Sequence, residues 1–186
     1  MDYPYRQPAV TLRALRDKGV VAVGRYAAPS TFRKTLTPVE ALEIRSASIG
    51  IVVVFEEGAR NALGGVAQGT KDGLTAREVA QRAGIPAAAP VFFAIDFEPL
   101  TSQVPLVRAY LKAAIQSCGH PSSSLYGAAW LCSDLAGDFP GAWVAGAWRG
   151  RIPSDARLFQ ARSSVRLCGV TLDEDRILDP HFAEGL

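Results

Sequence analysis

The stretch PVFFAIDFEP, residues 90–99, decides the predicted fold. It is an apolar run too short for a buried helix, and it ends in two carboxylates, Asp96 and Glu98. Side chains along a strand point alternately to the two faces of a sheet. The odd-numbered residues 91–97 therefore form a wholly apolar face, while the opposite face carries both acids at its carboxyl end. The stretch predicts a buried parallel strand that ends in a candidate site.

Similar apolar runs alternate with amphipathic segments along the rest of the chain. The predicted helices cover residues 8–18, 36–48, 62–84 and 103–118, and the predicted strands cover residues 20–26, 51–57, 90–99, 124–127, 143–148, 157–161 and 169–175. Thr37, Pro38 and Glu40 take the N-cap, the first helical position and the third, which is typical of a helix start. The alternation of strands and helices indicates an α/β protein.

Strands that alternate with helices pair in parallel through right-handed crossovers. The seven internal strands and a further short one at residues 1–3 make eight, a number that favours a closed barrel over an open sheet. No glycine-rich phosphate or dinucleotide motif follows any strand. We therefore predict one domain over residues 1–186, a short (β/α)8 TIM-like barrel with reduced helices in its C-terminal half.

Composition and charge exclude several classes of protein. The formal charge is only +2, and the arginines are scattered rather than gathered in the run expected of a nucleic-acid-binding arm. No apolar stretch approaches the roughly 18 residues of a membrane span. The N-terminus also lacks the charged-then-apolar pattern of a signal peptide. We expect neither a nucleic acid nor a membrane as partner, and delivery by phage lysis or another export route, or otherwise a cytoplasmic protein.

The cysteines and histidines do not predict a metal site. Cys118, Cys132 and Cys168 have no CxxC spacing, and only His120 and His181 could join them as ligands. We expect three buried, reduced thiols, no metal and no cofactor. A Cys–His nucleophile pair is also disfavoured, because His120 follows the C-terminus of a predicted helix rather than the end of a strand.

The carboxylate pair suits the cleavage of glycosidic bonds. Two acids held close together raise each other's proton affinity, so that one stays protonated while the other is ionised. Glycosidic cleavage needs a proton for the leaving oxygen and negative charge near the developing oxocarbenium ion. The structural alternative is that Asp96 caps a loop and that Glu98 is simply solvated.

Further polar and aromatic residues fall at the ends of other predicted strands. The candidate substrate-binding residues are Asp2, Arg25, Glu56, Tyr126, Trp148, Gln160 and Asp173. Aromatic rings stack on the apolar faces of sugars, and acids and amides bind the hydroxyl groups. Each residue also has a structural alternative, since Tyr126 and Trp148 suit a core and Glu56 could pair with Arg25.

Several segments, in this order, resemble a known family. They are DYP at 2–4, LRALRDKGVVAVGRY at 12–26, KTLTPVEALEI at 34–44, IVVVFEEGARNALGG at 51–65, PVFFAIDFEP at 90–99, LYG at 125–127 and GVTLDEDR at 169–176. Together they resemble the glycoside-hydrolase-like domain of actinobacterial secreted proteins and phage lysins. That domain is similar to the glycoside hydrolase family 25 muramidases, which are short β/α barrels.

The resemblance implies roles for the acids. Glu98 would be the general acid, and Asp96 would position the substrate's N-acetyl group or stabilise charge. Asp2 and Asp173 match acids on the first and last strands of the family. The chain departs from the family at Ala161, where an aromatic residue usually follows the glutamine of the seventh strand.

Three functions compete on these observations. The first is a monomeric muramidase that cleaves β-1,4 glycosidic bonds in peptidoglycan or a related glycan. The second, motivated by Ala161, is a non-catalytic barrel that binds wall glycan or forms part of a virion or wall complex. The third is an aldolase or lyase, which ranks last because all four lysines fall in predicted helices or loops.

Overall fold

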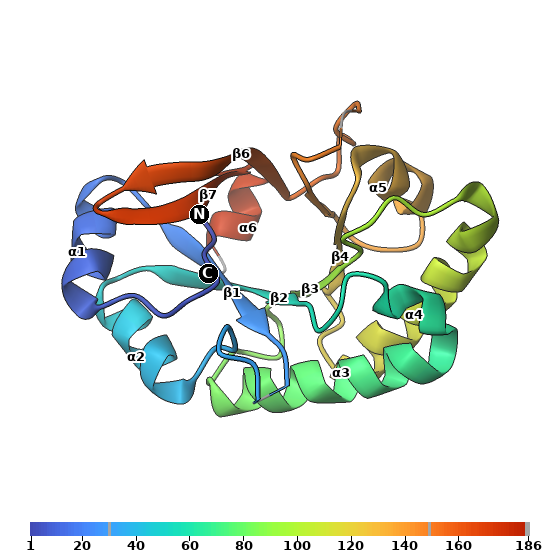
Figure 1. Cartoon of the computed structure of the whole chain (residues 1–186), viewed down its shortest axis with the longest axis horizontal. Coiled ribbons are helices and arrows are strands. Elements are labelled where there is room, and N and C mark those ends of the chain that lie inside the picture. Colours follow the sequence, from blue (N-terminus) through green and yellow to red (C-terminus); the bar gives the residue numbers. More distant parts are fainter. Residues whose placement is uncertain (30, 149, 185–186) are drawn as a thin grey trace.

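A computed structural model describes residues 1–29, 31–148 and 150–184 (Figure 1). The fold is a mixed α/β architecture built on a curled seven-stranded sheet whose strand order follows the chain. Its strands are β1 (Ala22–Ala27), β2 (Gly50–Phe55), β3 (Val91–Ala94), β4 (Ser124–Gly127), β5 (Trp143–Val144), β6 (Leu158–Leu167) and β7 (Val170–Ile177). Its helices are α1 (Ala9–Asp17), α2 (Pro38–Ser46), α3 (Gly65–Arg82), α4 (Val104–Cys118), α5 (Ala129–Leu135) and α6 (Pro180–Glu184), with 3-10 turns at Asn61–Gly64 and Thr101–Gln103.

The strands β1 to β6 pair in parallel, as predicted, but β7 runs antiparallel to β6. The expectation of parallel pairing throughout was wrong for this last pair. Only Cys168 and Gly169 separate the two strands, and both have positive φ angles, of 51° and 81°. A two-residue turn with positive φ joins antiparallel strands, whereas a parallel pair needs a crossover of about a dozen residues.

The predicted first strand is represented by one residue. Asp2 forms a parallel bridge with Gly24 of β1 and an antiparallel bridge with Asp173 of β7. Asp2 and Asp173 exchange two backbone hydrogen bonds, of 3.0 and 2.9 Å. The N-terminal segment thus lies between the two outermost strands, but the described residues include no regular eighth strand. A complete eight-stranded β/α barrel is not confirmed.

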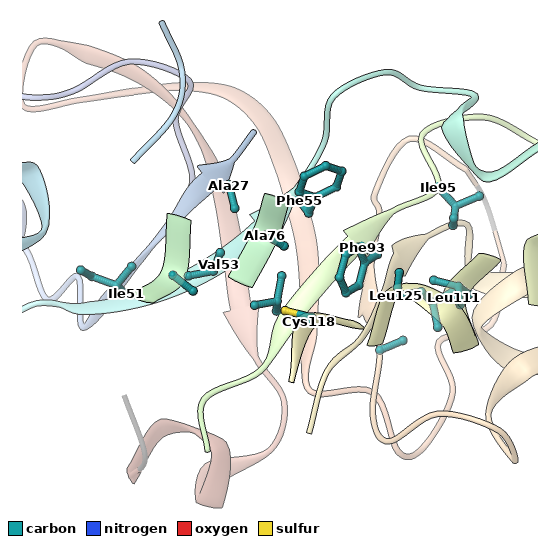
Figure 2. Packing of buried hydrophobic residues seen from close by; sticks show 14 of the residues in the cluster. Ala27, Ile51, Val53, Phe55, Ala76, Phe93, Ile95, Leu111, Cys118 and Leu125 are labelled. Carbon is teal, nitrogen blue, oxygen red and sulfur yellow. The ribbon is translucent and has the colours of Figure 1, made fainter. Parts of the chain in front are cut away.

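Two apolar layers cover the two faces of the sheet. Figure 2 shows part of the larger layer, in which strand residues meet residues of α3 and α4: Val53, Phe55, Phe93, Ile95, Leu125, Ala76, Leu111 and Cys118. The smaller layer lies inside the curl of the sheet and includes Phe92, Ala94, Trp143 and, from α6, Phe182. Residues 91–95 contribute alternately to the two layers, which confirms the alternation predicted for this strand.

The predicted start of α2 is confirmed, and the prediction of three buried thiols is confirmed for two of them. The Thr37 hydroxyl accepts a hydrogen bond of 3.2 Å from the backbone N–H of Glu40, so it caps α2 as predicted. All three thiols are free, and Cys118 and Cys132 are buried. Cys168 is only half-buried, contrary to the prediction, because it lies in the turn between β6 and β7.

The helices α3 and α4 approach closely at two glycines of α3. A methyl group at Gly73 would lie 2.2 Å from the carbonyl oxygen of Ala114, and one at Gly69 would lie 2.3 Å from that of Tyr110. We expect Gly73→Ala to lower the free energy of unfolding by about 2 kcal/mol, because overpacking against backbone outweighs the better helix propensity of alanine. Urea unfolding followed by circular dichroism measures the change.

The control variant for Gly73 is Gly137→Ala. Gly137 has no positive φ angle, and a methyl group there would meet no atom within 4 Å. We expect Gly137→Ala to leave the unfolding midpoint unchanged. Equal midpoints for both variants would contradict the close packing of α3 on α4.

Candidate active site at the carboxyl end of the sheet

The two acids of residues 90–99 follow β3 rather than belonging to it, because the strand ends at Ala94. Both Asp96 and Glu98 are exposed, whereas Ile95 and Phe97 are buried in the outer apolar layer. The alternation of the strand therefore continues past its last residue. It leaves the two acids at the carboxyl end of the sheet, on the side away from the helices.

Electrostatic surroundings distinguish Asp96 from Glu98. The pKa of Asp96 is raised, first because the carboxyl group is partly removed from water and then because Glu56 adds negative charge, and Lys34 opposes the shift. Within the described residues, Glu98 has no hydrogen bond and no ion pair. Asp96 thus belongs to a charged cluster, while the Glu98 side chain extends into solvent.

Lys34 and Glu56 form an ion pair beside Asp96. The Lys34 ammonium donates a hydrogen bond of 2.6 Å to Glu56 and lies 4.6 Å from the ring centroid of Tyr26. Each member of the pair is about one-fifth exposed, at 20% and 23%. Lys34 lies in the loop after β1, as predicted, and its side chain reaches Glu56 just after the end of β2.

Arg25 does not belong to the site, contrary to its prediction as a substrate-binding residue. Its side chain is fully buried and pairs with Glu40 of α2, with two N–O distances of 2.7 and 3.1 Å. It also donates to the carbonyl oxygens of Tyr3 and Lys34, at 2.6 and 3.1 Å. Neighbouring residues of a strand face opposite ways, so Tyr26 points into the curl while Arg25 points to the helices.

A chain of hydrogen bonds connects β4, β6 and β7. The Tyr126 hydroxyl donates to the side-chain oxygen of Gln160 at 3.2 Å, and the Gln160 amide donates to Asp173 at 2.9 Å. The backbone N–H groups of Gly146 and Ser164 donate to Gln160 and Asp173, at 3.3 and 2.8 Å. These bonds fix the orientation of the amide and hold the Asp173 carboxylate by two donors.

Two residues of this region were not singled out in the sequence. Asp175 accepts a hydrogen bond of 3.0 Å from the indole N–H of Trp143, and both side chains are buried inside the curl. Asp175 could have been found from its distance along the chain to Asp173, which was already a candidate. The two residues are two apart on one strand, and such residues share a face. Trp143 is the first residue of β5, which has only two residues. So short a strand has too few residues for the alternation of side chains to show which face Trp143 occupies.

Asp2 lies in the same region but is buried, with 6% of its surface exposed. One of its carboxyl oxygens has no hydrogen-bond partner among the described residues. Burial raises the pKa of Asp2 to about 8, and the negative charges of Asp175 and Asp173 add to the shift. These surroundings favour the neutral form of the Asp2 carboxyl group in the folded protein.

The predicted candidates therefore divide into two groups. Glu56, Tyr126, Gln160, Asp173 and Asp2 gather with the carboxyl end of β3. Trp148 does not: it is half-buried and packs against the outer apolar layer, away from the curl. Among the members of the first group, Gln160 and Asp2 are buried, which leaves Glu56, Tyr126 and Asp173 as the partly accessible ones.

Comparison with known proteins identifies the family. The model of the Rv2525c-like, glycoside hydrolase-like domain matches residues 13–175. The chain belongs to this family. No curated protein sequence matches it.

Solved structures resemble this glycoside-hydrolase-like chain over nearly its whole length. The Tat-secreted protein Rv2525c of Mycobacterium tuberculosis, in complex with L-tartrate, is 24% identical with a TM-score of 0.86, over 98% of this chain and 96% of that one. An uncharacterized B. stearothermophilus protein is 17% identical with a TM-score of 0.73, over 97% and 95%. The catalytic domain of endolysin ply40, from bacteriophage P40 of Listeria monocytogenes, is 14% identical with a TM-score of 0.65, over 99% and 94%. The TM-scores show that these proteins share the fold of this chain.

The structure also contains a cavity that lies apart from Asp96 and Glu98. A cavity of about 330 Å³ opens where β1 begins, and its lining includes Lys18, Ala22, Trp143, Glu174 and Asp175. It borders neither of the exposed acids after β3. Across residues 1–29, 31–148 and 150–184, no three His, Cys, Asp or Glu side chains are grouped to hold a metal ion. No helix within these ranges is long and apolar enough to cross a membrane.

Proposed function

We propose that the protein is a glycoside hydrolase that cleaves β-1,4 glycosidic bonds in peptidoglycan. The observation that carries the proposal is the position of Asp96 and Glu98, two exposed carboxyl groups at the carboxyl end of β3. One carboxyl group protonates the glycosidic oxygen as its bond to the anomeric carbon breaks, and negative charge nearby stabilises the oxocarbenium-like transition state. Water then supplies the hydroxyl group to the anomeric carbon, and its remaining proton restores the acid.

Family membership and one neighbour support this choice of reaction. The family is described as glycoside hydrolase-like, and the neighbour from bacteriophage P40 is the catalytic domain of an endolysin. The resemblance gives the role of acid to Glu98 and an assisting role to Asp96. The ring of Tyr126 lies near Asp96 and could stack on a sugar face.

The test is hydrolysis of purified peptidoglycan, measured by released reducing ends, in the wild type, Asp96→Asn and Glu98→Gln. We expect each substitution to lower the rate at least about a hundredfold, because removing a general acid or its carboxylate partner costs factors of this order. The matched control is Glu57→Gln, whose carboxylate contacts Asn61 and Lys71 instead of the acids after β3.

The control should retain the wild-type rate. Wild-type activity in both Asp96→Asn and Glu98→Gln would remove these residues from the reaction. An inactive wild type that is fully folded would contradict the proposed function itself.

A second candidate is a protein that binds wall glycan without cleaving it. Ala161 favours this function, because it follows Gln160 where the family usually has an aromatic residue to stack on a sugar. Sedimentation with insoluble wall material, without release of reducing ends, would support it. An aldolase is disfavoured, because the Lys34 ammonium is paired with Glu56 and is not the free amine that a Schiff base requires.

We also propose that the protein acts outside the cytoplasm, as a monomer. The neighbour Rv2525c is described as Tat-secreted, and a wall substrate would require export or release. Fractionation of the native cells locates the protein, and recovery from the cytoplasm alone would contradict this placement.

A further inference from the structure

We infer that Glu56, held by Lys34, is the carboxylate partner of Asp96, and that Lys34 is a positioning residue for both acids. The inference deepens the proposed hydrolase function and rests on it for its catalytic meaning. Asp96 then has two carboxylate neighbours, Glu98 on its own segment and Glu56 from the neighbouring strand β2.

The register of the sheet supports this pairing. Phe55 of β2 lies opposite Phe93 of β3, so Glu56, the next residue, lies beside Ala94. Residues two apart share a face, which places Asp96 on the same side of the sheet as Ala94 and Glu56. Glu98 lies two residues further along the chain, beyond Asp96 as counted from the end of β3.

Lys34 holds Glu56 at this edge. Its ammonium lies between the Glu56 carboxylate, at 2.6 Å, and the ring of Tyr26, whose centroid is 4.6 Å away. The backbone beneath is also fixed, since the Glu56 N–H donates to Ala27 at 3.3 Å and the Lys34 carbonyl accepts from buried Arg25. The ion pair is thus attached at both ends to ordered parts of the fold.

This arrangement acts on the charge of Asp96. A neighbouring carboxylate disfavours the ionised form of an acid, and a neighbouring ammonium favours it. Burial and Glu56 both raise the pKa of Asp96, and Lys34 limits the rise. Glu56 therefore disfavours the ionised form of Asp96 and Lys34 favours it, so this ion pair sets the pH at which Asp96 becomes the assisting carboxylate. The remaining groups around Asp96 are the Tyr126 phenol, whose own pKa is raised by burial, and Glu98 on the same segment.

The direct test is a carbon-13 NMR titration of the Asp96 carboxyl group in the full-length protein. We expect Glu56→Gln to lower the pKa of Asp96, because a negative charge is removed, and Lys34→Gln to raise it, because a positive charge is removed. Lys34→Arg should restore the wild-type value. Glu57→Gln and Glu98→Gln are the matched controls and should move the pKa of Asp96 less than Glu56→Gln does.

Activity gives a second measurement. If Asp96 assists as a carboxylate, the rate rises as pH rises through its pKa, so Glu56→Gln moves this acid limb to lower pH and Lys34→Gln moves it to higher pH. A larger response of the titration to Glu98→Gln than to Glu56→Gln would overturn the pairing. Because the titration needs no turnover, a correct titration with an inactive wild type would contradict the hydrolase function and leave the pairing intact.

Discussion

Replacing Arg25 by methionine is expected to lower the free energy of unfolding by about 3–5 kcal/mol. The substitution leaves the carboxylate of Glu40, which is 1% exposed, without its partner in the interior. It also removes the donors to the carbonyl oxygens of Tyr3 and Lys34. Such a loss is a large fraction of the 5–15 kcal/mol that stabilises a typical domain. Urea unfolding followed by circular dichroism measures it.

Two further variants separate the buried charge from other effects. Arg82→Met is the control, because Arg82 pairs with Glu78 on the exposed side of α3, where such pairs contribute about 0.2–0.5 kcal/mol. The double variant Arg25→Met with Glu40→Leu should recover part of the loss, because no unpaired charge remains. A loss below about 1 kcal/mol in Arg25→Met would contradict the buried ion pair as a main support of α2 on β1.

Strong local signals predicted most of the fold. The strand at 90–99 was predicted from alternation and lies where expected, although only Val91–Ala94 pair as a strand. The start of α2 followed from Thr37 and Pro38. The antiparallel β7 was missed because apolar pattern gives a strand's position but not its direction. The predicted strands at 157–161 and 169–175 left only residues 162–168 between them, fewer than the roughly dozen that a parallel crossover needs, and this short connection was the signal for an antiparallel pair.

The site was predicted less completely than the fold. The two acids and Glu56 followed from strand ends and alternation, but Arg25 was misplaced because only one of two adjacent strand residues can face the curl. Lys34 could not be found in this way, since a loop has no periodicity to show where a long side chain reaches. Pairings such as Lys34 with Glu56 depend on contacts between segments that are distant in sequence.

Asp2 forms bridges with Gly24 of β1 and Asp173 of β7, and we call this junction the seam. We expect its contribution to the free energy of unfolding to fall as pH rises. The ordinary pKa of an aspartate is 3.8, and that of buried Asp2 is raised to about 8. Asp173 and Asp175 contribute negative charge to this rise, while the Met1 amino group, 3.4 Å from Asp175, opposes it. Between these two pKa values the folded protein keeps a proton that the unfolded chain releases. The stability from this group is therefore complete below about pH 4 and lost as pH rises to about 8.

Asp2→Asn removes the titrating group and keeps a side chain of similar shape whose amide can donate a hydrogen bond. We expect the unfolding free energy of the wild type to fall relative to that of Asp2→Asn by about 1.4 kcal/mol per pH unit between pH 5 and 7, and to level off above pH 8. Urea unfolding at one-unit steps from pH 5 to 9 gives both curves, and Asp17→Asn, at an exposed position of α1, controls for the change in net charge. Parallel curves for the wild type and Asp2→Asn would mean that Asp2 is ionised in the folded protein, and that the seam tolerates three neighbouring carboxylates.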